Sequence, residues 1–312
     1  MFFRQSTRTN AIGDEIVRSM LDGFSSRGLA ADKFALTLLV HDDNRGRIFG
    51  EDATPAIGYS YRGNEFFYPC SVIKVFYLVA AQDALEKERI VETPELRRAM
   101  HDMIKWSSNT ATNYIIDILT GTTGDTDLAP EAFAPWVAAR GTINAFFQSL
   151  GLPELEGINV SQKLMDDDRY GREKAFAQLG GNNHNRLNTN AAASMMARIM
   201  DGAVISPERS RIMADFLYRP RDAAFVETPT AQVLDYMGGG VPSDAELWSK
   251  AGWTAWTGDP LASYRRHDAI HVALPGVRRF TFVLFTEGKE ISANMTLLPF
   301  VGKRAAELVA AM

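Results

Sequence analysis

Strand-like segments lie near both ends of this 312-residue chain, and helix-like segments fill its middle. Near the N-terminus, the run from Phe34 to His41 is rich in apolar and β-branched residues and stops at a turn-prone stretch, after which residues 56–61 offer a partner strand. Toward the C-terminus, three strand-like runs joined by short turns predict an antiparallel meander: Leu247 to Trp256, Tyr264 to Leu274 and Arg279 to Glu287. Because both ends supply strands, we predict one sheet shared by the terminal segments, with a helical domain inserted between them.

Helical patterns dominate the middle of the chain, where apolar residues recur every three to four positions. The run from Val72 to Arg89 has no glycine or proline and predicts a mostly buried helix, and Thr93 followed by Pro94 marks the start of the next helix. Residues 157–190 are polar and irregular and predict a long ordered loop. The expected helices cover residues 12–27, 72–89, 93–106, 109–119, 142–150, 191–200, 207–217, 230–236 and 294–312. We therefore expect a discontinuous sheet domain at residues 1–66 and 222–312 and a helical domain at residues 67–221.

Composition and charge exclude several classes of protein. Hydrophobic residues make up 46% of the chain and charged residues 23%, which is typical of a globular protein. The net charge is -5 and no basic block could neutralise a row of phosphates, so we expect no nucleic-acid partner. The longest apolar run has about seven residues, far fewer than the ~20 of a membrane-spanning helix, so we expect no membrane partner. The start of the chain lacks a secretory pattern, which favours the cytoplasm, or the periplasm or secretion if a leader was removed.

No pattern for a metal or a cofactor stands out. Cys70 is the single cysteine, which excludes an internal disulfide and a cysteine-based metal cluster. The five histidines lack metal-ligand spacing, and the glycines at 238–240 lack the residues of a phosphate-binding loop. We expect no metal and no cofactor.

One short motif has the spacing of a nucleophile and its base. Ser71 and Lys74 lie three residues apart at the start of the predicted helix, so both side chains fall on one face and the amine reaches the hydroxyl. A serine hydroxyl becomes a good nucleophile when a neighbour takes its proton, and a lysine does so when its pKa is lowered. The alternative interpretation is a capping serine and a solvated lysine.

Two further motifs follow in order, Ser107-Ser108-Asn109 between two predicted helices and Lys250-Ala251-Gly252 on a predicted strand. Together the three motifs resemble those of the penicillin-recognising serine hydrolases, above all the class A β-lactamases, and the stretches FFYPCSVIKVF and SSNTATN are especially similar to that class. The resemblance implies a β-lactamase/transpeptidase-like α/β (α+β) fold. Such a fold has an antiparallel five-stranded sheet flanked by helices and an inserted all-α domain.

The resemblance also implies a role for each matching residue. Ser71 would be the acylated nucleophile, Lys74 would help to deprotonate it, and Ser107 would pass a proton to the leaving nitrogen. Lys250 would supply positive charge toward a substrate carboxylate and help to hold Ser107 and Lys74 in a network.

Substrate binding falls to the same motifs and to the residue that follows the third. Asn109 would hydrogen-bond a substrate amide, and Gly252 would lie on the strand that lines the site. The backbone N–H groups of Ser71 and Trp253 would form the oxyanion hole.

The chain departs from the class A pattern at several points. The Glu-x-x-Leu-Asn element, whose glutamate activates the deacylating water, is absent. Residue 251 is Ala where Thr or Ser usually binds the β-lactam carboxylate, and Ser108 stands where an aspartate is usual. Ser71 and Ser107 are only 36 residues apart, which implies that a loop forming one wall of the site is missing. Residues 157–190 offer other groups that could activate water, namely Asp166, Asp167, Asp168, Glu173 and His184.

We therefore predict a serine hydrolase that acts through a Ser71 acyl-enzyme on a small-molecule amide or ester, with β-lactam hydrolysis as one candidate activity. Two alternatives stay open. One is an esterase or acyl-transfer enzyme for a substrate other than a β-lactam, which the missing glutamate favours. The other is a non-catalytic binding protein on a β-lactamase scaffold. A second Ser-x-Asn at Ser292 to Asn294 is interpreted as a helix cap, and the sequence sets neither the natural substrate nor the oligomeric state.

Overall fold

The two ends of the chain meet in one antiparallel sheet. The computed structural model describes residues 2–41, 56–164 and 169–312. The described strands are β1 (Phe34–Val40), β2 (Ile57–Tyr61), β3 (Glu246–Thr254), β4 (Arg265–Ala273) and β5 (Phe280–Glu287). They form a five-stranded sheet in the order β2-β1-β5-β4-β3, and all four pairings are antiparallel. The predicted sheet and its C-terminal meander are confirmed, and β3 lies at one edge of the sheet.

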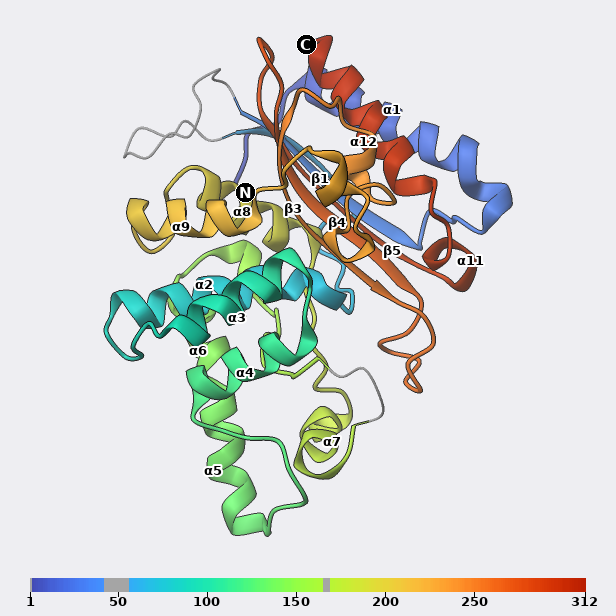
Figure 1. Cartoon of the computed structure of the whole chain (residues 1–312). Coiled ribbons are helices and arrows are strands. Elements are labelled where there is room, and N and C mark those ends of the chain that lie inside the picture. Colours follow the sequence, from blue (N-terminus) through green and yellow to red (C-terminus); the bar gives the residue numbers. More distant parts are fainter. Residues whose placement is uncertain (1, 42–55, 165–168) are drawn as a thin grey trace.

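Helices cover both faces of this sheet (Figure 1). The helices of the described residues are α1 (Thr7–Phe24), α2 (Lys74–Glu86), α3 (Pro94–Lys105), α4 (Asn109–Thr120), α5 (Pro130–Arg140), α6 (Thr142–Ser149), α7 (Gly171–Ala177), α8 (Thr189–Met200), α9 (Pro207–Leu217), α10 (Ala223–Val226), α11 (Lys289–Ser292) and α12 (Leu297–Ala310). Thr93 caps α3 and accepts a hydrogen bond from the Leu96 backbone, as the Thr-Pro sequence predicts.

Three segments differ from the sequence prediction. Pro130 starts α5, a helix in a proline-containing stretch that the pattern left without one, and Gly171 starts α7 inside the predicted loop. Proline suits the first turn of a helix, where its missing N–H is not needed. The prediction of a helix at residues 230–236 is wrong. A short 3-10 turn there is followed by Gln232, whose left-handed conformation (φ 55°) does not fit an α-helix.

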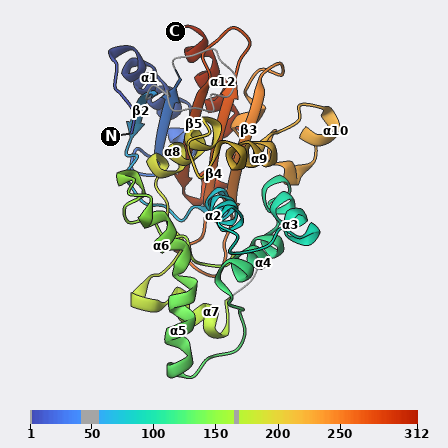
Figure 2. The same cartoon turned by 90° about the vertical axis from the view of Figure 1, so that its left-hand side faces the viewer.

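Each face of the sheet has its own hydrophobic core. One core joins α1 and α12 to one face of the sheet, and the other joins the opposite face to the remaining large helices. Figures 1 and 2 show α8 against the sheet, and it contacts β1, β4 and β5 although its residues belong to the predicted helical domain. The core of the helical part continues onto the sheet and therefore marks no boundary between two domains. The domain limits remain a prediction.

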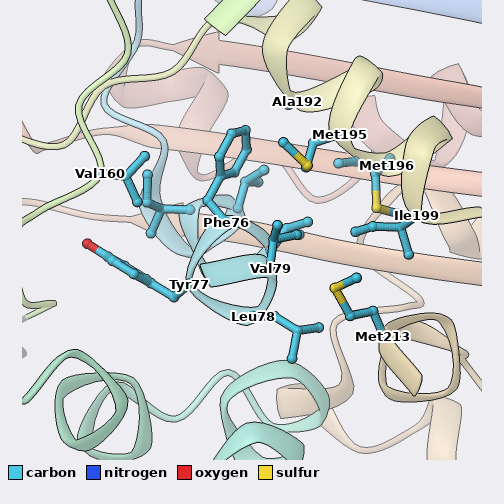
Figure 3. Close-up of a cluster of buried hydrophobic side chains, with 14 of the residues drawn as sticks. Phe76, Tyr77, Leu78, Val79, Val160, Ala192, Met195, Met196, Ile199 and Met213 are labelled. Atoms are coloured by element: carbon cyan, nitrogen blue, oxygen red, sulfur yellow. The ribbon is translucent and has the colours of Figure 1, made fainter. Parts of the chain in front are cut away.

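Helix α2 runs through the centre of the second core. Every residue from Lys74 to Leu85 is buried, in agreement with the predicted buried helix. Figure 3 shows Phe76, Leu78 and Val79 surrounded by side chains of α8 and α9. The Tyr77 hydroxyl donates a hydrogen bond of 2.7 Å to the backbone oxygen of Gln162, so its buried polar end is satisfied. This packing fixes α2, whose first residue is Lys74.

One buried arginine links the helical part to the sheet edge. Arg219 is 1% exposed and follows α9. Its guanidinium donates to the carbonyls of Ile104 and Lys105 at the end of α3, at 2.9 and 3.1 Å, and to the carbonyl of Ser249 on β3, at 2.8 Å. Burial lowers the pKa of Arg219 to about 10, so the group stays cationic at neutral pH. The arginine therefore ties the end of α3 to β3.

Replacing this arginine with a single-point donor tests the link. An Arg219→Lys amine has one nitrogen in place of three, so it leaves buried carbonyls without a partner. We expect the free energy of unfolding to fall by about 2–4 kcal/mol, since each hydrogen bond to a charged group contributes roughly 1.5–3 kcal/mol. Urea denaturation measures this. The control is Arg97→Lys on α3, an exposed arginine paired with Glu92, for which we expect a change within about 0.5 kcal/mol. Equal stability of the two variants would contradict the assignment.

Candidate active site

The three sequence motifs converge on the hydroxyl of Ser107. Lys74 Nζ lies 3.2 Å from Ser107 Oγ, and Lys250 Nζ lies 3.0 Å from the same oxygen. Lys74 also donates to the Ser107 carbonyl at 2.5 Å and to Asn109 Oδ1 at 2.8 Å. One hydroxyl thus joins two lysines that are 176 residues apart in sequence.

Ser71 lies in the 3-10 turn Cys70–Ile73 that leads into α2. Cys70 takes a left-handed conformation (φ 49°) and is buried, and Ser71 is partly exposed. Strand β3 lies directly against this turn, because a Cβ on Gly252 would come within 2.7 Å of the Ser71 nitrogen. Only glycine permits this approach, which explains its place after the Lys-Ala pair. The segment Gly252–Trp253 therefore borders the Ser71 backbone, where the predicted oxyanion hole would lie.

A histidine that the sequence did not single out holds the chain just before Ser71. His267 on β4 receives a hydrogen bond from the Thr286 N–H at Nδ1, so its proton is on Nε2, which donates to the Tyr68 carbonyl at 2.9 Å. Burial lowers the pKa of His267 to about 3, and the ring stays neutral. The sequence signal that could have identified His267 is its position on a predicted strand next to the strand of the Lys-Ala-Gly motif.

Ser107 and Ser108 have different tasks. Ser107 takes a left-handed conformation (φ 57°) between α3 and α4, which aims both its carbonyl and its hydroxyl at Lys74. Ser108 caps α4 by accepting a hydrogen bond of 3.1 Å from the Ala111 N–H. The serine that replaces the usual aspartate thus supports the turn through the helix end. At Ser292 to Asn294 the capping interpretation is confirmed, since Asn294 accepts from the backbone of Thr296 and Leu297.

Lys250 is completely buried. Besides Ser107 Oγ, its amine has two acceptors, Gln232 Oε1 at 2.8 Å and the Ala251 carbonyl at 2.7 Å. Burial, followed by the charge of Lys74, lowers the pKa of Lys250 well below its ordinary value. Sequence reasoning missed Gln232, because its contact depends on the left-handed turn in a segment predicted to be helical.

Leu164, within the predicted loop of residues 157–190, contacts helix α4 of the site, but the two described candidates for a water-activating base are paired with other side chains. Glu173 is buried in an ion pair with Arg140, whose two terminal nitrogens lie 2.7 and 3.2 Å from the carboxylate oxygens. His184 Nε2 lies 2.5 Å from Asp259 in the β3–β4 connection. The other three candidates, Asp166, Asp167 and Asp168, lie outside the described residues.

The same segment is tied to the site helix at an apolar residue. Asn113, one turn after Asn109 on α4, accepts from the Leu164 N–H at 2.9 Å and donates to the Leu164 carbonyl at 2.8 Å. One turn further on, Asp117 pairs with Lys163 at 2.7 Å. The polar stripe of α4 therefore contacts both Lys74 and residues 163–164, and the residue that Asn113 holds through two backbone hydrogen bonds, Leu164, has an apolar side chain.

A cavity of about 380 Å³ lies at the end of β3, lined by Tyr68, Thr254, His184 and the β3–β4 connection. Within the described part of the chain, no group of three or more His, Cys, Asp and Glu residues could hold a metal ion. Among the same residues, no helix is both long and apolar enough to span a bilayer.

Several known proteins share this architecture. A class A β-lactamase from Bacteroides cellulosilyticus DSM 14838 is 15% identical, with 98% of this chain and 100% of that one covered and a TM-score of 0.65. A β-lactamase from Sphaerobacter thermophilus DSM 20745 is 16% identical over 96% and 98% of the two chains, with a TM-score of 0.63. A mutant of PBP-A, solved as an acyl-enzyme complex with penicillin G, is 18% identical over 96% and 97%, with a TM-score of 0.58. These likenesses confirm the predicted fold.

None of the curated proteins compared with the chain matches it. The sequence profile of one family, described as the β-lactamase enzyme family, matches residues 89–311. That range includes Ser107 and Asn109, which contact Lys74. It also includes Lys250, which contacts Ser107, and Gly252, which lies against the turn that carries Ser71. The chain therefore belongs to the β-lactamase enzyme family, and its fold is that of the β-lactamase-like serine hydrolases.

Proposed function

We propose that this protein is a serine hydrolase that forms an acyl-enzyme at Ser71 from an amide or ester. The observation that carries the proposal is the single hydroxyl of Ser107 between the amines of Lys74 and Lys250. Two buried amines joined through a hydroxyl can move protons between the nucleophile and a leaving group. A merely structural role would not require two buried amines joined through one hydroxyl, because burying ionisable groups of like charge together is costly.

The two lysines share one proton fewer than two ammonium groups would carry. Lys250 has two carbonyl acceptors, Gln232 Oε1 and the Ala251 oxygen, and these use two N–H bonds. A neutral amine then has its lone pair left for the Ser107 hydroxyl proton, and Lys74 holds the charge. When that proton shifts through Ser107 to Lys250, Lys74 becomes the neutral base. The lowered pKa of Lys250 supports this assignment.

Acylation then proceeds with balanced proton transfers. Lys74 takes the proton of Ser71, the Ser71 oxygen bonds to the carbonyl carbon, and the backbone N–H groups of Ser71 and Trp253 stabilise the oxyanion. The bond from that carbon to the leaving nitrogen or oxygen breaks, and Ser107 gives its proton to the leaving atom. Lys74 or Lys250 restores the proton of Ser107. Asn109 accepts from Lys74 and would also orient a substrate amide.

Deacylation is expected to be slow with water. Glu173 and His184 are bound to other partners, and the residue that Asn113 clamps beside the site is Leu164. This arrangement supports the second candidate function, transfer of the acyl group to an acceptor other than water. The intact lysine network weighs against the non-catalytic alternative. β-Lactam hydrolysis, as opposed to β-lactam acylation, is the less supported activity.

Covalent labelling tests the proposal. We expect a penicillin, a cephalosporin or an activated ester such as p-nitrophenyl acetate to add one acyl group to Ser71, visible as an intact-mass increase that persists after excess reagent is removed. The Ser71→Ala variant lacks the nucleophile and should stay unmodified, while Ser108→Ala, which alters only a helix cap, should still be labelled. The absence of both an adduct and product formation with all three reagents would contradict the proposed function.

The pH dependence of acylation tests the proton network. The lowered pKa of Lys250 favours its neutral form, and acidification adds a second charge to the pair, so the acylation rate should fall on the acid side. Lys250→Met removes the amine that takes up the proton of Lys74 through Ser107, so Lys74 stays protonated to higher pH and we expect the acid limb to move to higher pH. Lys303→Met, at an exposed position of α12, is the control and should leave the profile unchanged. An acid limb that stays in place in Lys250→Met would contradict the network.

A further inference from the structure

We infer that the leaving-group side of the cleft is built for a neutral, apolar group and not for a carboxylate. The inference rests on the proposed function and names the substrate class of the same site. The leaving-group side is the surface around Ser107, which delivers the proton, and therefore includes its partner Lys250 and the strand residues that follow. The family resemblance predicts that this surface attracts a carboxylate, and the contacts of this chain differ.

The amine of Lys250 has no hydrogen left for a substrate anion. Ser107 Oγ, Gln232 Oε1 and the Ala251 carbonyl lie within 2.7–3.0 Å of Nζ and match the three positions of the amine. The side chain is completely buried, so a carboxylate would have to displace one of these partners. Ala251, 1% exposed, adds no hydroxyl to receive it.

The two arginines of the neighbouring strand β4 are also committed to other groups. Arg266, 3% exposed, has its guanidinium 4.5 Å from the centre of the Tyr236 ring and donates to the Asp235 carbonyl at 3.0 Å. Arg265 donates to the Ser263 carbonyl at 2.7 Å and pairs with Glu287 at 3.3 Å. The terminal nitrogens of both arginines thus bind the protein's own groups, and the Nε atoms that have no hydrogen-bond partner are buried.

Apolar side chains lie exposed at the same place. We define the apolar rim as Leu234, Trp253 and Met295, which are 50%, 47% and 52% exposed. All three are positioned around Arg266. Leu234 precedes Asp235, whose carbonyl accepts from Arg266, and Trp253 is the register partner of Arg266 on the neighbouring strand. The Met295 sulfur lies 3.5 Å from Arg266 Nη2.

The indole of Trp253 is held in place, because its Nε1 donates to the Ser292 carbonyl at 2.8 Å. A fixed, half-exposed aromatic next to Gly252 and Ser71 offers apolar contact area at little cost in side-chain entropy. A neutral leaving group would bury this surface, whereas a carboxylate would be desolvated against it without a partner.

Matched esters test the inference. Phenylacetate esters of 3-hydroxybenzoic acid and of its methyl ester share one acyl group, and their leaving groups differ in the charged carboxylate. We expect the second-order acylation rate constant at pH 7.5 to be at least about tenfold higher for the neutral ester, after correction for the uncatalysed rates. Trp253→Ala keeps the backbone N–H of this residue and should lower the rate for the neutral ester more than the rate for the anionic ester. The control is Trp256→Ala, which removes another exposed tryptophan three residues further along.

The outcomes separate the two proposals. Equal rates for the two esters, or a faster anionic ester, would overturn the inference while the Ser71 acyl-enzyme stands. An equal loss for both esters in Trp253→Ala would also overturn it, because that pattern indicates a general disturbance of the site. No acylation by either ester would instead contradict the proposed function. Ala251→Thr adds a hydroxyl and is expected to narrow the gap between the two esters.

Discussion

The candidate site depends on the hydrogen bonds of one buried arginine. Ser107 follows α3 and Lys250 lies on β3, so the hydroxyl and amine that meet at 3.0 Å come from different parts of the fold. Arg219 donates to the last carbonyls of α3 and to Ser249, the residue next to Lys250. Because these bonds are buried and charge-assisted, they fix the distance between the two elements more firmly than apolar packing alone would. The same link brings a third cation near the two lysines and helps to lower the pKa of Lys250.

The Lys74 and Lys250 amines lie against the same Ser107 hydroxyl but have different surroundings. On one side Lys74 contacts the Ser107 hydroxyl and Asn109, close to the turn that carries Ser71. On the other side the Lys250 amine donates to Gln232 and to the Ala251 carbonyl. The neighbouring surface is formed by the exposed side chains of the apolar rim. The chain thus keeps the serine and lysine residues of the three motifs, while Ala251 and the exposed apolar side chains differ from the pattern that binds β-lactam carboxylates.

The sequence predicted those parts of the molecule that follow local rules. The three C-terminal strands were found because apolar runs end at clear turns, and Ser71, Lys74 and Ser107 were found because short motifs fix their spacing. Gln232 was missed because its contact with Lys250 depends on a left-handed residue, which periodicity does not reveal. Arg219 was missed because its partners are backbone carbonyls, which any sequence supplies. Helix α5 was missed because its proline residues suggested irregular structure. The roles of the site residues in catalysis remain predictions.

The central claim is that Lys74 and Lys250 share their protons through Ser107, and their titration tests it most directly. Protein labelled with ¹³C and ¹⁵N at lysine, with the two signals assigned from Lys74→Arg and Lys250→Arg, reports the protonation of each amine through its Cε chemical shift. We predict that at least one of the two amines titrates well below the ordinary lysine value of about 10.5, and that the Ser107→Ala substitution changes the titration of both. Two amines that titrate independently near 10.5, unaffected by Ser107→Ala, would contradict the account.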